Sequence, residues 1–262
     1  MSSSLPVGVF DSGVGGLSIL EKIHQLHPRE SILYVADSAF APYGPKGDEF
    51  IIQRSRHLMD FYLSHQVKAV VVACNTATAA AVAQLREDYD LPIVGMEPAL
   101  KPAALASSSG VIGVLATEGT LASDKFVDLK SRFDGDVEII TKPCSGLVEH
   151  IEQVVPDWQA INHLLKEYIT PLLDKKVDTI VLGCTHYSFL TTQIKEIAGP
   201  DIAIVDTDDA VARRLGSVLE EKDLLKNDKV PGEITFYSSG DLSIQKKLIS
   251  RCWGKEVNVL PL

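Results

Sequence analysis

The sequence predicts an α/β protein with two similar, doubly wound domains, each built on a mostly parallel sheet, and an active site in the cleft between them. Three observations lead to this fold class. Apolar strand patterns alternate with helical patterns along almost all of the 262 residues, which is typical of βαβ units. The runs 69–73 and 179–183 are apolar without alternation, as in strands covered on both faces. Two pairs of segments also repeat at nearly the same offset, which indicates internal pseudo-symmetry.

Individual elements follow from the period of the apolar residues. Short apolar runs predict strands, and longer segments with the helical period predict the helices between them. Strands are expected near residues 5–10, 31–36, 68–73, 92–95, 111–115, 136–141, 178–182, 202–206, 233–238 and 256–259. Helices are expected near residues 15–27, 47–65, 75–88, 118–133, 145–155, 158–175, 186–198, 207–225 and 241–251.

The repeated segments predict the domain organisation. Residues 7–13 resemble residues 112–118, an offset of 112 − 7 = 105, and the segments that end at Cys74 and Cys184 are offset by 184 − 74 = 110. Such long offsets indicate two related halves rather than a solenoid. We expect a second domain at 98–207 and a first domain at 1–97 that is completed by 208–262. The Ser-rich stretch 106–110 is expected to link the halves.

The overall charge excludes some classes of partner. The chain carries 35 acidic residues and 25 Lys or Arg residues, so its formal net charge is −10. This balance argues against binding to nucleic acid or to an anionic membrane, both of which need a basic surface.

Targeting signals and cysteine usage indicate a cytoplasmic protein. The first residues lead directly into a strand-like run, without the charged and apolar regions of a secretory signal. The longest uncharged stretch, 69–85, contains Asn75, Thr76 and Thr78 and is better explained by a buried strand plus an Ala-rich helix than by a membrane span. Four widely spaced cysteines indicate no disulfide framework.

Two cysteines occupy equivalent positions in the repeat. Cys74 and Cys184 each follow an apolar strand and precede a predicted helix. A single buried cysteine is usually a small hydrophobe, but packing does not require cysteine at both repeats. A helix N-terminus is expected to lower the pKa of each thiol, which would make it an effective general base. Two thiols facing each other across a cleft suit a racemase, which needs an acid and a base on opposite faces of its substrate.

Two further segments are candidates for binding substrate. The stretch Asp11-Ser12-Gly-Val-Gly-Gly16 follows a strand, and its glycines permit close backbone approach although the spacing is not that of a P-loop. Asp11 is unusual in an anion-binding turn, so we expect it to have a functional role. The loop 41–46 is either a rigid turn or a cap for a substrate carboxylate, made by Tyr43 and the amide of Gly44.

His186 and two glutamates are candidates for proton relay. A metal site at Cys74, Cys184 and His186 lacks the short spacing of zinc motifs, so no metal is predicted. His186 is expected to tune or relay the proton of a nearby thiol. Glu149 and Glu152 lie three residues apart on one helical face, and either can enter the cleft. An exposed acidic face is the alternative.

Several blocks in the same order resemble the glutamate racemase family, within the aspartate/glutamate racemase superfamily. The resemblance runs along nearly the whole chain. It is carried by residues 9–17 (VFDSGVGGL), 36–37 with 42–44 (AD, PYG), 73–77 (ACNTA), 97–98 (EP), 112–120 (IGVLATEGT), 182–187 (LGCTHY) and 236–241 (FYSSGD).

The resemblance implies a role for each site residue. Cys74 and Cys184 are expected to be the two catalytic acid/base residues, with Cys74 serving D-glutamate and Cys184 serving L-glutamate. Asp11 is expected to assist Cys74, and Glu152 and His186 to assist Cys184. The implied substrate-binding residues are Asp11, Ser12, Pro42, Tyr43, Gly44, Cys74, Asn75, Thr76, Thr117, Cys184, Thr185 and His186.

The resemblance also implies the reaction and its partners. It implies interconversion of L- and D-glutamate by two-thiol proton transfer at Cα, without a cofactor, to supply D-glutamate for peptidoglycan. A homodimer and a peptidoglycan-precursor activator are both compatible with it. Two positions depart from the family. Glu149-His150 occupies a stretch where the family usually has proline, which leaves Glu149 as an alternative to Glu152, and Ser188 replaces a common proline.

Two other functions are compatible with the residues. One is a related enzyme that acts on aspartate or another small dicarboxylate. The other is a non-catalytic protein that binds its ligand in a cleft between two domains. The matched thiols argue against the second.

Overall fold

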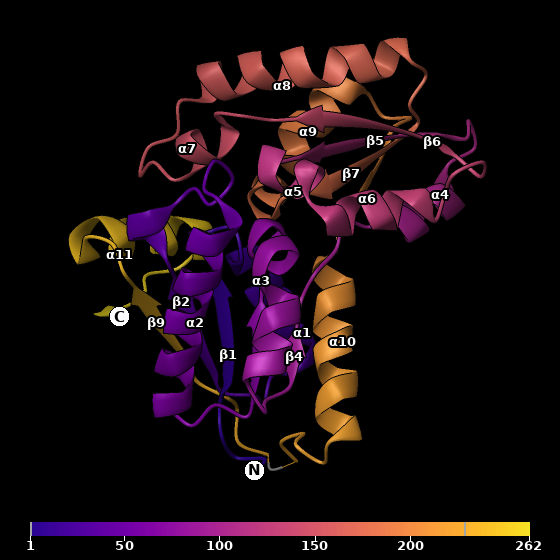
Figure 1. Cartoon of the computed structure of the whole chain (residues 1–262). Helices are drawn as coiled ribbons and strands as arrows, with labels where there is room; N and C mark the ends of the chain where they lie inside the picture. Colours follow the sequence, from indigo (N-terminus) through magenta and orange to yellow (C-terminus); the bar gives the residue numbers. More distant parts are fainter. Residues whose placement is uncertain (1, 228) are drawn as a thin grey trace.

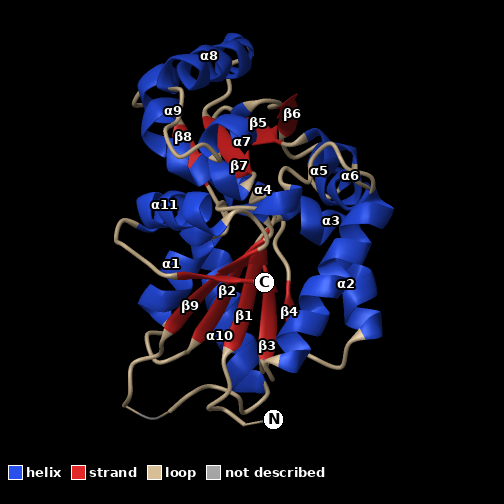
Figure 2. Ribbon diagram, turned by 90° about the vertical axis from the view of Figure 1, so that its left-hand side faces the viewer, coloured by secondary structure: helices blue, strands red, loops and turns tan. Residues whose placement is uncertain are grey.

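The chain forms two parallel sheets, each flanked by helices, in a computed structural model that describes residues 2–227 and 229–262 (Figures 1 and 2). The larger sheet has the strand order β10-β9-β2-β1-β3-β4. The smaller sheet has the order β6-β5-β7-β8. Every strand pair is parallel, and the predicted α/β fold class is confirmed.

The larger sheet combines the first part of the chain with its last part. Its strands are β1 Val7–Asp11, β2 Ile32–Ala36, β3 Ala69–Val72, β4 Ile93–Val94, β9 Ile234–Ser238 and β10 Val259–Pro261. Its helices are α1 Leu17–Leu26, α2 Asp48–Ser64, α3 Asn75–Asp88, α10 Asp208–Glu221 and α11 Leu242–Trp253, with the 3₁₀ helix η1 at Ser38–Phe40.

Both faces of the larger sheet are buried, which explains its continuous apolar runs. Val9 faces the cluster that contains α1 and α10, whereas the next residue, Phe10, faces the cluster that contains α2 and α3. Figure 2 shows α2 and α3 on one side of this sheet and α1 and α11 on the other. Successive side chains of a strand point to opposite faces, so a strand covered on both sides needs apolar residues at every position.

The smaller sheet repeats the strand order of the larger one. Its strands are β5 Val111–Ala116, β6 Glu138–Pro143, β7 Thr179–Gly183 and β8 Ala203–Val205. Its helices are α4 Leu100–Ala106, α5 Glu118–Ala122, α6 Asp124–Ser131, α7 Leu147–Ile151, α8 Trp158–Asp174 and α9 Thr191–Ala198, with the 3₁₀ helix η2 at Thr185–Leu190. The order β6-β5-β7-β8 matches β2-β1-β3-β4, as an internal duplication predicts.

Sheet membership supports the domain bounds expected from the sequence. Strands β9 and β10 complete the larger sheet, and β5 to β8 form the smaller one. We propose the bounds 1–97 plus 208–262 for the first domain and 98–207 for the second. No helix in the described part of the chain is long and apolar enough to cross a membrane.

Some predicted elements were wrong. The helix expected at 118–133 is two helices, because the Ser123 hydroxyl accepts the amide of Phe126 and starts α6 there. The helix expected at 145–155 is only α7, and that expected at 186–198 begins as η2. Helix α4 was not predicted, and it packs on β7 and β8.

The expected linker at 106–110 is also wrong, because this segment is held against the second half of the chain. It leads directly from α4 into β5. The Asp178 carboxylate, which precedes β7, accepts the Ser107 hydroxyl at 2.7 Å and the amides of Ser108 and Ser109 at 2.7 and 2.6 Å. The serines form an ordered turn within the second half rather than a spacer between the halves.

Candidate active site

The carboxyl ends of β1, β3 and β7 bring the two cysteines and Asp11 into one region. Asp11 is the last residue of β1, Cys74 precedes α3, and Cys184 precedes η2. Ligands of parallel α/β sheets collect at these strand ends. Asp11, Cys74 and Cys184 are all buried, and the Asp11 carboxylate accepts the hydroxyl of Thr185, the neighbour of Cys184, at 3.0 Å. The two halves of the chain therefore contribute to one shared site.

The Cys74 thiol is held neutral by its surroundings. Its sulfur lies 3.9 Å from the Ser12 hydroxyl and accepts the amide of Ala77 at 3.4 Å as the N-cap of α3. Burial raises the pKa of the Cys74 thiol, and the negative charge of Asp11 raises it further. The lowered thiol pKa expected from the helix N-terminus is therefore wrong for Cys74, because desolvation outweighs the single amide contact.

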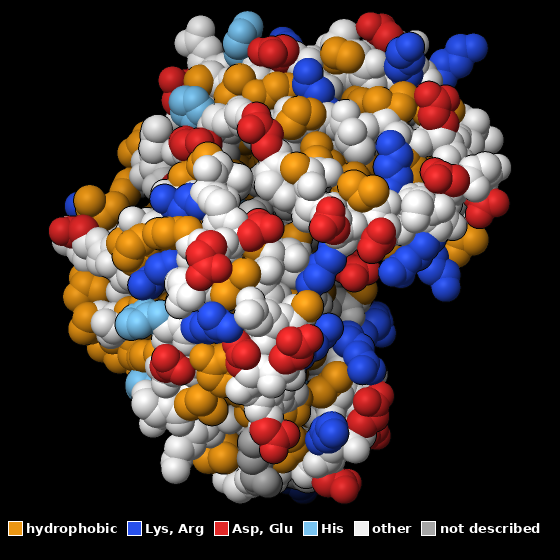
Figure 3. Space-filling model, viewed as in Figure 1, with side chains coloured by type: hydrophobic (Ala, Val, Ile, Leu, Met, Phe, Trp, Pro, Cys, Tyr) orange, Lys and Arg blue, Asp and Glu red, His pale blue; other side chains and the backbone are white. Residues whose placement is uncertain are grey.

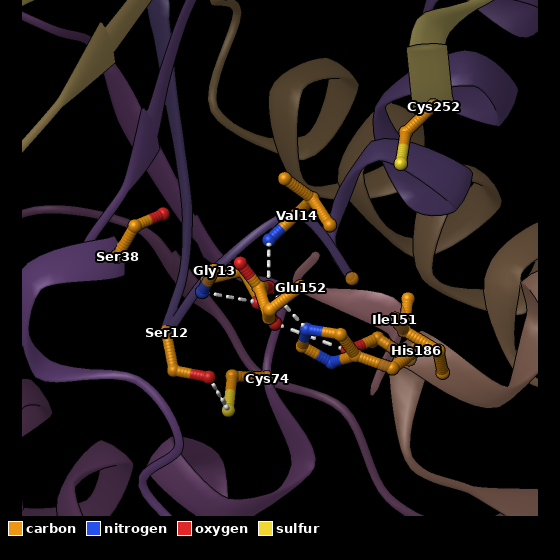
Figure 4. A network of polar contacts seen from close by, with 12 residues as sticks. Ser12, Gly13, Val14, Ser38, Cys74, Ile151, Glu152, His186 and Cys252 are labelled. Atoms are coloured by element: carbon orange, nitrogen blue, oxygen red, sulfur yellow. Dashed lines mark hydrogen bonds and ion pairs between the residues drawn. The ribbon is translucent and has the colours of Figure 1, made fainter. Parts of the chain in front are cut away.

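Cys184 lies at the end of a chain of polar contacts. Its sulfur is 3.9 Å from Nδ1 of His186, and Nε2 of His186 is 2.7 Å from Oε1 of Glu152. The same carboxylate oxygen accepts the backbone amide of Val14 at 2.7 Å. Figure 4 shows Glu152 between Val14 of the first half and His186 of the second. This network joins the two halves directly behind Cys184.

The hydrogen-bond partners of His186 favour its protonated form. Burial alone lowers the pKa of the imidazole, but hydrogen bonds with Cys184 and Glu152, together with the charge of Asp11, raise it well above the ordinary value. An imidazolium next to a thiol stabilises the thiolate. The two cysteines thus occupy equivalent strand ends with different proton partners.

Asp11 connects the glycine-rich turn to the second half. Its two carboxylate oxygens accept the amide of Gly13 at 2.7 Å and the hydroxyl of Thr185 at 3.0 Å. Burial raises the pKa of Asp11, and the positive charge of His186 opposes this rise. The carboxylate is thereby placed near both cysteines.

The glycines of this turn permit the two halves to approach closely. A Cβ atom at Gly13 would lie 1.9 Å from Oε1 of Glu152, and one at Gly15 would lie 2.4 Å from Nδ1 of His186. Glu152 and His186, which contact each other at 2.7 Å, would have to shift to make room for a side chain at either glycine. The close approach expected from the sequence is present. The anion that contacts the backbone of this turn is the carboxylate of Glu152, which accepts the amide of Val14.

Asn75 is a buried amide without a hydrogen-bond partner. It is 4% exposed, and both of its side-chain polar atoms lack a partner in the described parts of the chain. A buried unpaired amide is unfavourable by about 1–3 kcal/mol. Its position directly after Cys74 makes it available to a carboxylate that enters the site.

Three threonine hydroxyls connect α3 to α5 across the two halves. The Thr76 hydroxyl is 3.0 Å from that of Thr117 and 3.3 Å from that of Thr120, and Thr117 donates to Thr120 at 2.9 Å. Sequence reasoning identified Thr76 and Thr117 but missed Thr120. The signal available for Thr120 was its place three residues after Thr117. This is the spacing of a helix N-cap, and Thr117 caps α5 by accepting the amide of Thr120.

The Tyr43 hydroxyl is already engaged by the protein. It donates to Asp37 at 2.5 Å, and Arg54 binds the same carboxylate through two nitrogens at 3.1 and 2.7 Å. Asp37 and Arg54 were not identified from the sequence, since no local motif joins them. Pro42 and Gly44 line a cavity of about 80 Å³ that Thr117, Cys144 and Glu149 also line.

The geometry distinguishes the two glutamates. Glu149 is exposed and faces this small cavity, whereas Glu152 contacts His186. The described residues include no cluster of three or more metal-binding side chains.

Comparisons with known proteins agree with this architecture. A family model described as Asp/Glu/Hydantoin racemase matches residues 7–215. A glutamate racemase of Pseudomonas entomophila (strain L48) is 52% identical over 251 residues, covering 95% of this chain and 94% of that protein. A glutamate racemase of Ectopseudomonas mendocina (strain ymp) is 50% identical and covers 98% of both chains.

Solved structures are similar over the same length. A glutamate racemase isoform of Bacillus anthracis has a TM-score of 0.90 at 31% identity and covers 99% of this chain and 98% of its own. Escherichia coli glutamate racemase, solved with L-glutamate and the activator UDP-MurNAc-Ala, has a TM-score of 0.84 at 30% identity and covers 98% of this chain and 97% of its own.

The fold, the paired strand-end cysteines and these matches define a racemase with two parallel α/β sheets, and the chain belongs to the Asp/Glu/Hydantoin racemase family. Within that family it belongs to the glutamate racemases, which match it over nearly its whole length.

Proposed function

We propose that this chain interconverts L- and D-glutamate by proton transfer between Cα and two thiols, those of Cys74 and Cys184. The observation that carries the proposal is that two buried thiols lie at equivalent strand ends of opposite halves, where Cys74 contacts Ser12 and the adjacent Asp11 binds Thr185 beside Cys184. The 52% identity to a glutamate racemase supports glutamate as the substrate.

The proposed reaction uses one thiolate and one thiol in each direction. With L-glutamate, the Cys184 thiolate removes the Cα proton and becomes a thiol, while the neutral Cys74 thiol gives its proton to the opposite face and becomes a thiolate. The reverse transfer converts D-glutamate. The imidazolium of His186, held by Glu152, stabilises the Cys184 thiolate, and the Asp11 carboxylate acts on Cys74.

The substrate carbanion must be stabilised by the protein itself. We assign the α-carboxylate to the Asn75 amide and the Thr76 and Thr185 hydroxyls, where negative charge grows during deprotonation. Ser12, Pro42, Tyr43, Gly44 and Thr117 complete the proposed binding surface. The Tyr43 hydroxyl is used by Asp37, so we assign Tyr43 a role through its ring and position. Closure of the two halves excludes water and strengthens these contacts.

Proton exchange in D₂O tests the proposal. Purified protein incubated with L-glutamate in D₂O, without added cofactor, is expected to form D-glutamate that carries deuterium at Cα until the enantiomers are equal. The products are followed by chiral chromatography and ¹H NMR. Binding of glutamate without exchange would instead favour a binding protein, and exchange with aspartate alone would favour a related racemase.

Variants of the cysteines test the assignment of the two bases. Cys74→Ala and Cys184→Ala are each expected to lower racemisation by about 10²-fold to 10⁴-fold, the usual contribution of one general acid or base. Cys144→Ala removes a buried thiol outside the pair and is the matched control. Full activity of either single variant contradicts the two-thiol mechanism.

We further propose that an anionic peptidoglycan precursor regulates the reaction. A cavity of about 620 Å³ lies between α3, α6 and α10, and its lining includes Arg86, Lys125, Arg132 and Arg214. Figure 3 shows a hollow between the two lobes with Lys and Arg side chains on both sides. The Escherichia coli relative, solved with UDP-MurNAc-Ala, suggests the ligand class. A titration of racemase activity with UDP-MurNAc-Ala tests this regulation.

Location and assembly are also proposals. A cytoplasmic location is supported by the four free cysteines, two of which must stay reduced to act as acid and base. The family resemblance supports a homodimer. Light scattering of the purified protein measures its mass in solution.

A further inference from the structure

The position of Glu152 depends on a very short helix. Glu152 is the C-cap of α7, which has five residues. A helix of this length is not stable by itself, so its ends must be held by tertiary contacts. The carbonyl of Ile151, directly before Glu152, is one of the last carbonyls of α7, which no residue within the helix can satisfy.

Arg251 supplies a contact for this helix end from the other half of the chain. It lies in the last turn of α11, and its Nη2 donates to the carbonyl of Ile151 at 2.6 Å across 100 residues of sequence. A cationic donor at a helix C-terminus is favoured both by its charge and by the helix dipole. The contact therefore fixes where α7 ends.

The guanidinium also lies close to the proposed proton relay. Its Nη2 donates to the sulfur of the neighbouring Cys252 at 3.4 Å as well as to the carbonyl of Ile151, the residue before Glu152. Figure 4 shows Ile151, Glu152 and His186 together, with Cys252 of α11 nearby. The other nitrogen of Arg251, Nη1, is buried and has no hydrogen-bond partner in the described chain. Of the two hydrogen bonds made by Nη2, the one to the carbonyl of Ile151 joins Arg251 to the other half of the chain.

We infer that Arg251 is a positioning residue for the reaction: by holding the carbonyl of Ile151 it sets Glu152 against His186 and so supports proton transfer at Cys184. The inference rests on the proposed function, in which Glu152 and His186 assist Cys184. Arg251 does not touch the substrate. Its loss affects one of the two bases and leaves the other unchanged.

Kinetic isotope effects test this asymmetry. Arg251→Met is expected to lower kcat/KM by about 10-fold to 100-fold, equally in both directions because the two enantiomers have equal free energy. With α-deuterated L-glutamate the isotope effect is expected to rise, since proton removal by Cys184 becomes rate-limiting. With α-deuterated D-glutamate it is expected to fall. A general loss of structure would slow both steps and leave the two isotope effects in their original ratio.

Matched variants separate position from charge. Arg251→Lys keeps the charge and a donor, so it is expected to recover part of the activity and of the isotope-effect ratio. Arg213→Met removes an exposed arginine of α10 that pairs with Asp209, and it is expected to behave as wild type. An Arg251→Met variant that folds and keeps the wild-type isotope-effect ratio overturns the inference.

A measurement that needs no turnover separates this inference from the proposed function. The midpoint of His186 is followed by NMR of the imidazole and assigned by the missing signal in His186→Asn. In Arg251→Met this midpoint is expected to fall, because Glu152 no longer lies against the ring. An unchanged midpoint overturns the positioning role even if the wild-type protein racemises glutamate. A lowered midpoint supports it even if no D-glutamate is formed.

Discussion

At the scale of single residues, the site separates two identical side chains by their surroundings. Cys74 meets a helix amide, the Ser12 hydroxyl and a carboxylate that disfavours its ionisation, whereas Cys184 meets an imidazolium held by Glu152. The two thiols therefore have different proton partners. A racemase needs this asymmetry, because one group must accept a proton while the other donates.

Asn75 provides a prediction at this scale. Its unpaired amide is a cost in the free protein that a bound carboxylate removes. Asn75→Ala is expected to raise KM for both enantiomers by about tenfold or more, the loss of about one hydrogen bond to a charged group. Its melting temperature is expected to stay the same or rise.

Steady-state kinetics and thermal unfolding measure the two effects of Asn75→Ala. Thr78→Ala is the control, because the Thr78 hydroxyl is satisfied within the protein by the carbonyl of Val72 and the amide of Met96. Loss of stability without a change in KM is expected for Thr78→Ala. The same result for Asn75→Ala would contradict its role in binding.

At the scale of elements, the spacing of apolar residues along the sequence predicted the strands well and the ends of the helices poorly. Strands β1, β2 and β3 lie within one or two residues of their expected ranges because both faces must be apolar. The break between α5 and α6 depends on the cap at Ser123, which is one serine among several in a polar stretch. The turn at 107–110 depends on Asp178, about 70 residues away in sequence.

Asp178 provides a prediction for the turn before β5. Burial opposes its ionisation, but hydrogen bonds from Ser107, Ser109 and Thr179 outweigh this and lower its pKa to about 2. Asp178→Asn is expected to lower the free energy of unfolding at pH 7 by about 1–3 kcal/mol. Because the pKa of Asp178 is lower in the folded state, its ionised carboxylate stabilises the fold fully at pH values above its unfolded pKa of about 4. This stabilisation is lost as the pH falls through the folded pKa of about 2.

Urea unfolding at several pH values measures this effect. The difference between wild type and Asp178→Asn is expected to be constant from pH 7 to about pH 4 and to shrink towards pH 2. Asp136→Asn, at an exposed position of the same half, is expected to differ little from wild type at any pH. A difference for Asp178→Asn that does not depend on pH contradicts the ionic origin of the turn's stability.

At the scale of the whole molecule, the C-terminal part of the chain, which begins at 208, returns from the smaller sheet to the larger one and is held there by polar contacts. Lys68 and Glu30 form a buried ion pair at 2.5 Å. Lys68 also donates to the carbonyl of Leu224, and Glu30 accepts the amide of Lys226. At the other end, Asp208 begins α10, where the chain returns from the smaller sheet to the larger one.

Asp208 provides a prediction for this crossover. Burial raises its pKa to about 6 and the charge of Asp206 contributes, although the Ser18 and Ser188 hydroxyls and Lys22 oppose the rise. When a carboxyl pKa is raised by folding, ionisation opposes folding. The penalty is therefore absent below about pH 4, grows between pH 4 and 6, and is constant above pH 6.

Asp208→Asn removes this penalty. The free energy of unfolding of the variant is expected to rise relative to wild type between pH 4 and 6. Above pH 6 it is expected to stay on the order of 2 kcal/mol higher than that of wild type. Chemical denaturation across pH 4–8 measures the difference. Asp209→Asn, at the exposed neighbour, is expected to show a small difference at all pH values. A parallel pH profile for wild type and Asp208→Asn contradicts the prediction.

The sequence by itself determined the fold class, the duplication and the residue types of the site. Apolar period and repeated segments are local signals, and they place Asp11, Cys74 and Cys184 at strand ends before any packing is known. Only the tertiary structure decided how these groups are connected. It pairs His186 with Glu152 rather than Glu149, uses the Tyr43 hydroxyl for Asp37, and brings Thr120 and Arg251 to the junction between the halves. These contacts join residues up to 100 positions apart, and no period or local motif carries that information. Burial, which reversed the expected pKa of Cys74, is likewise a property of the packed molecule.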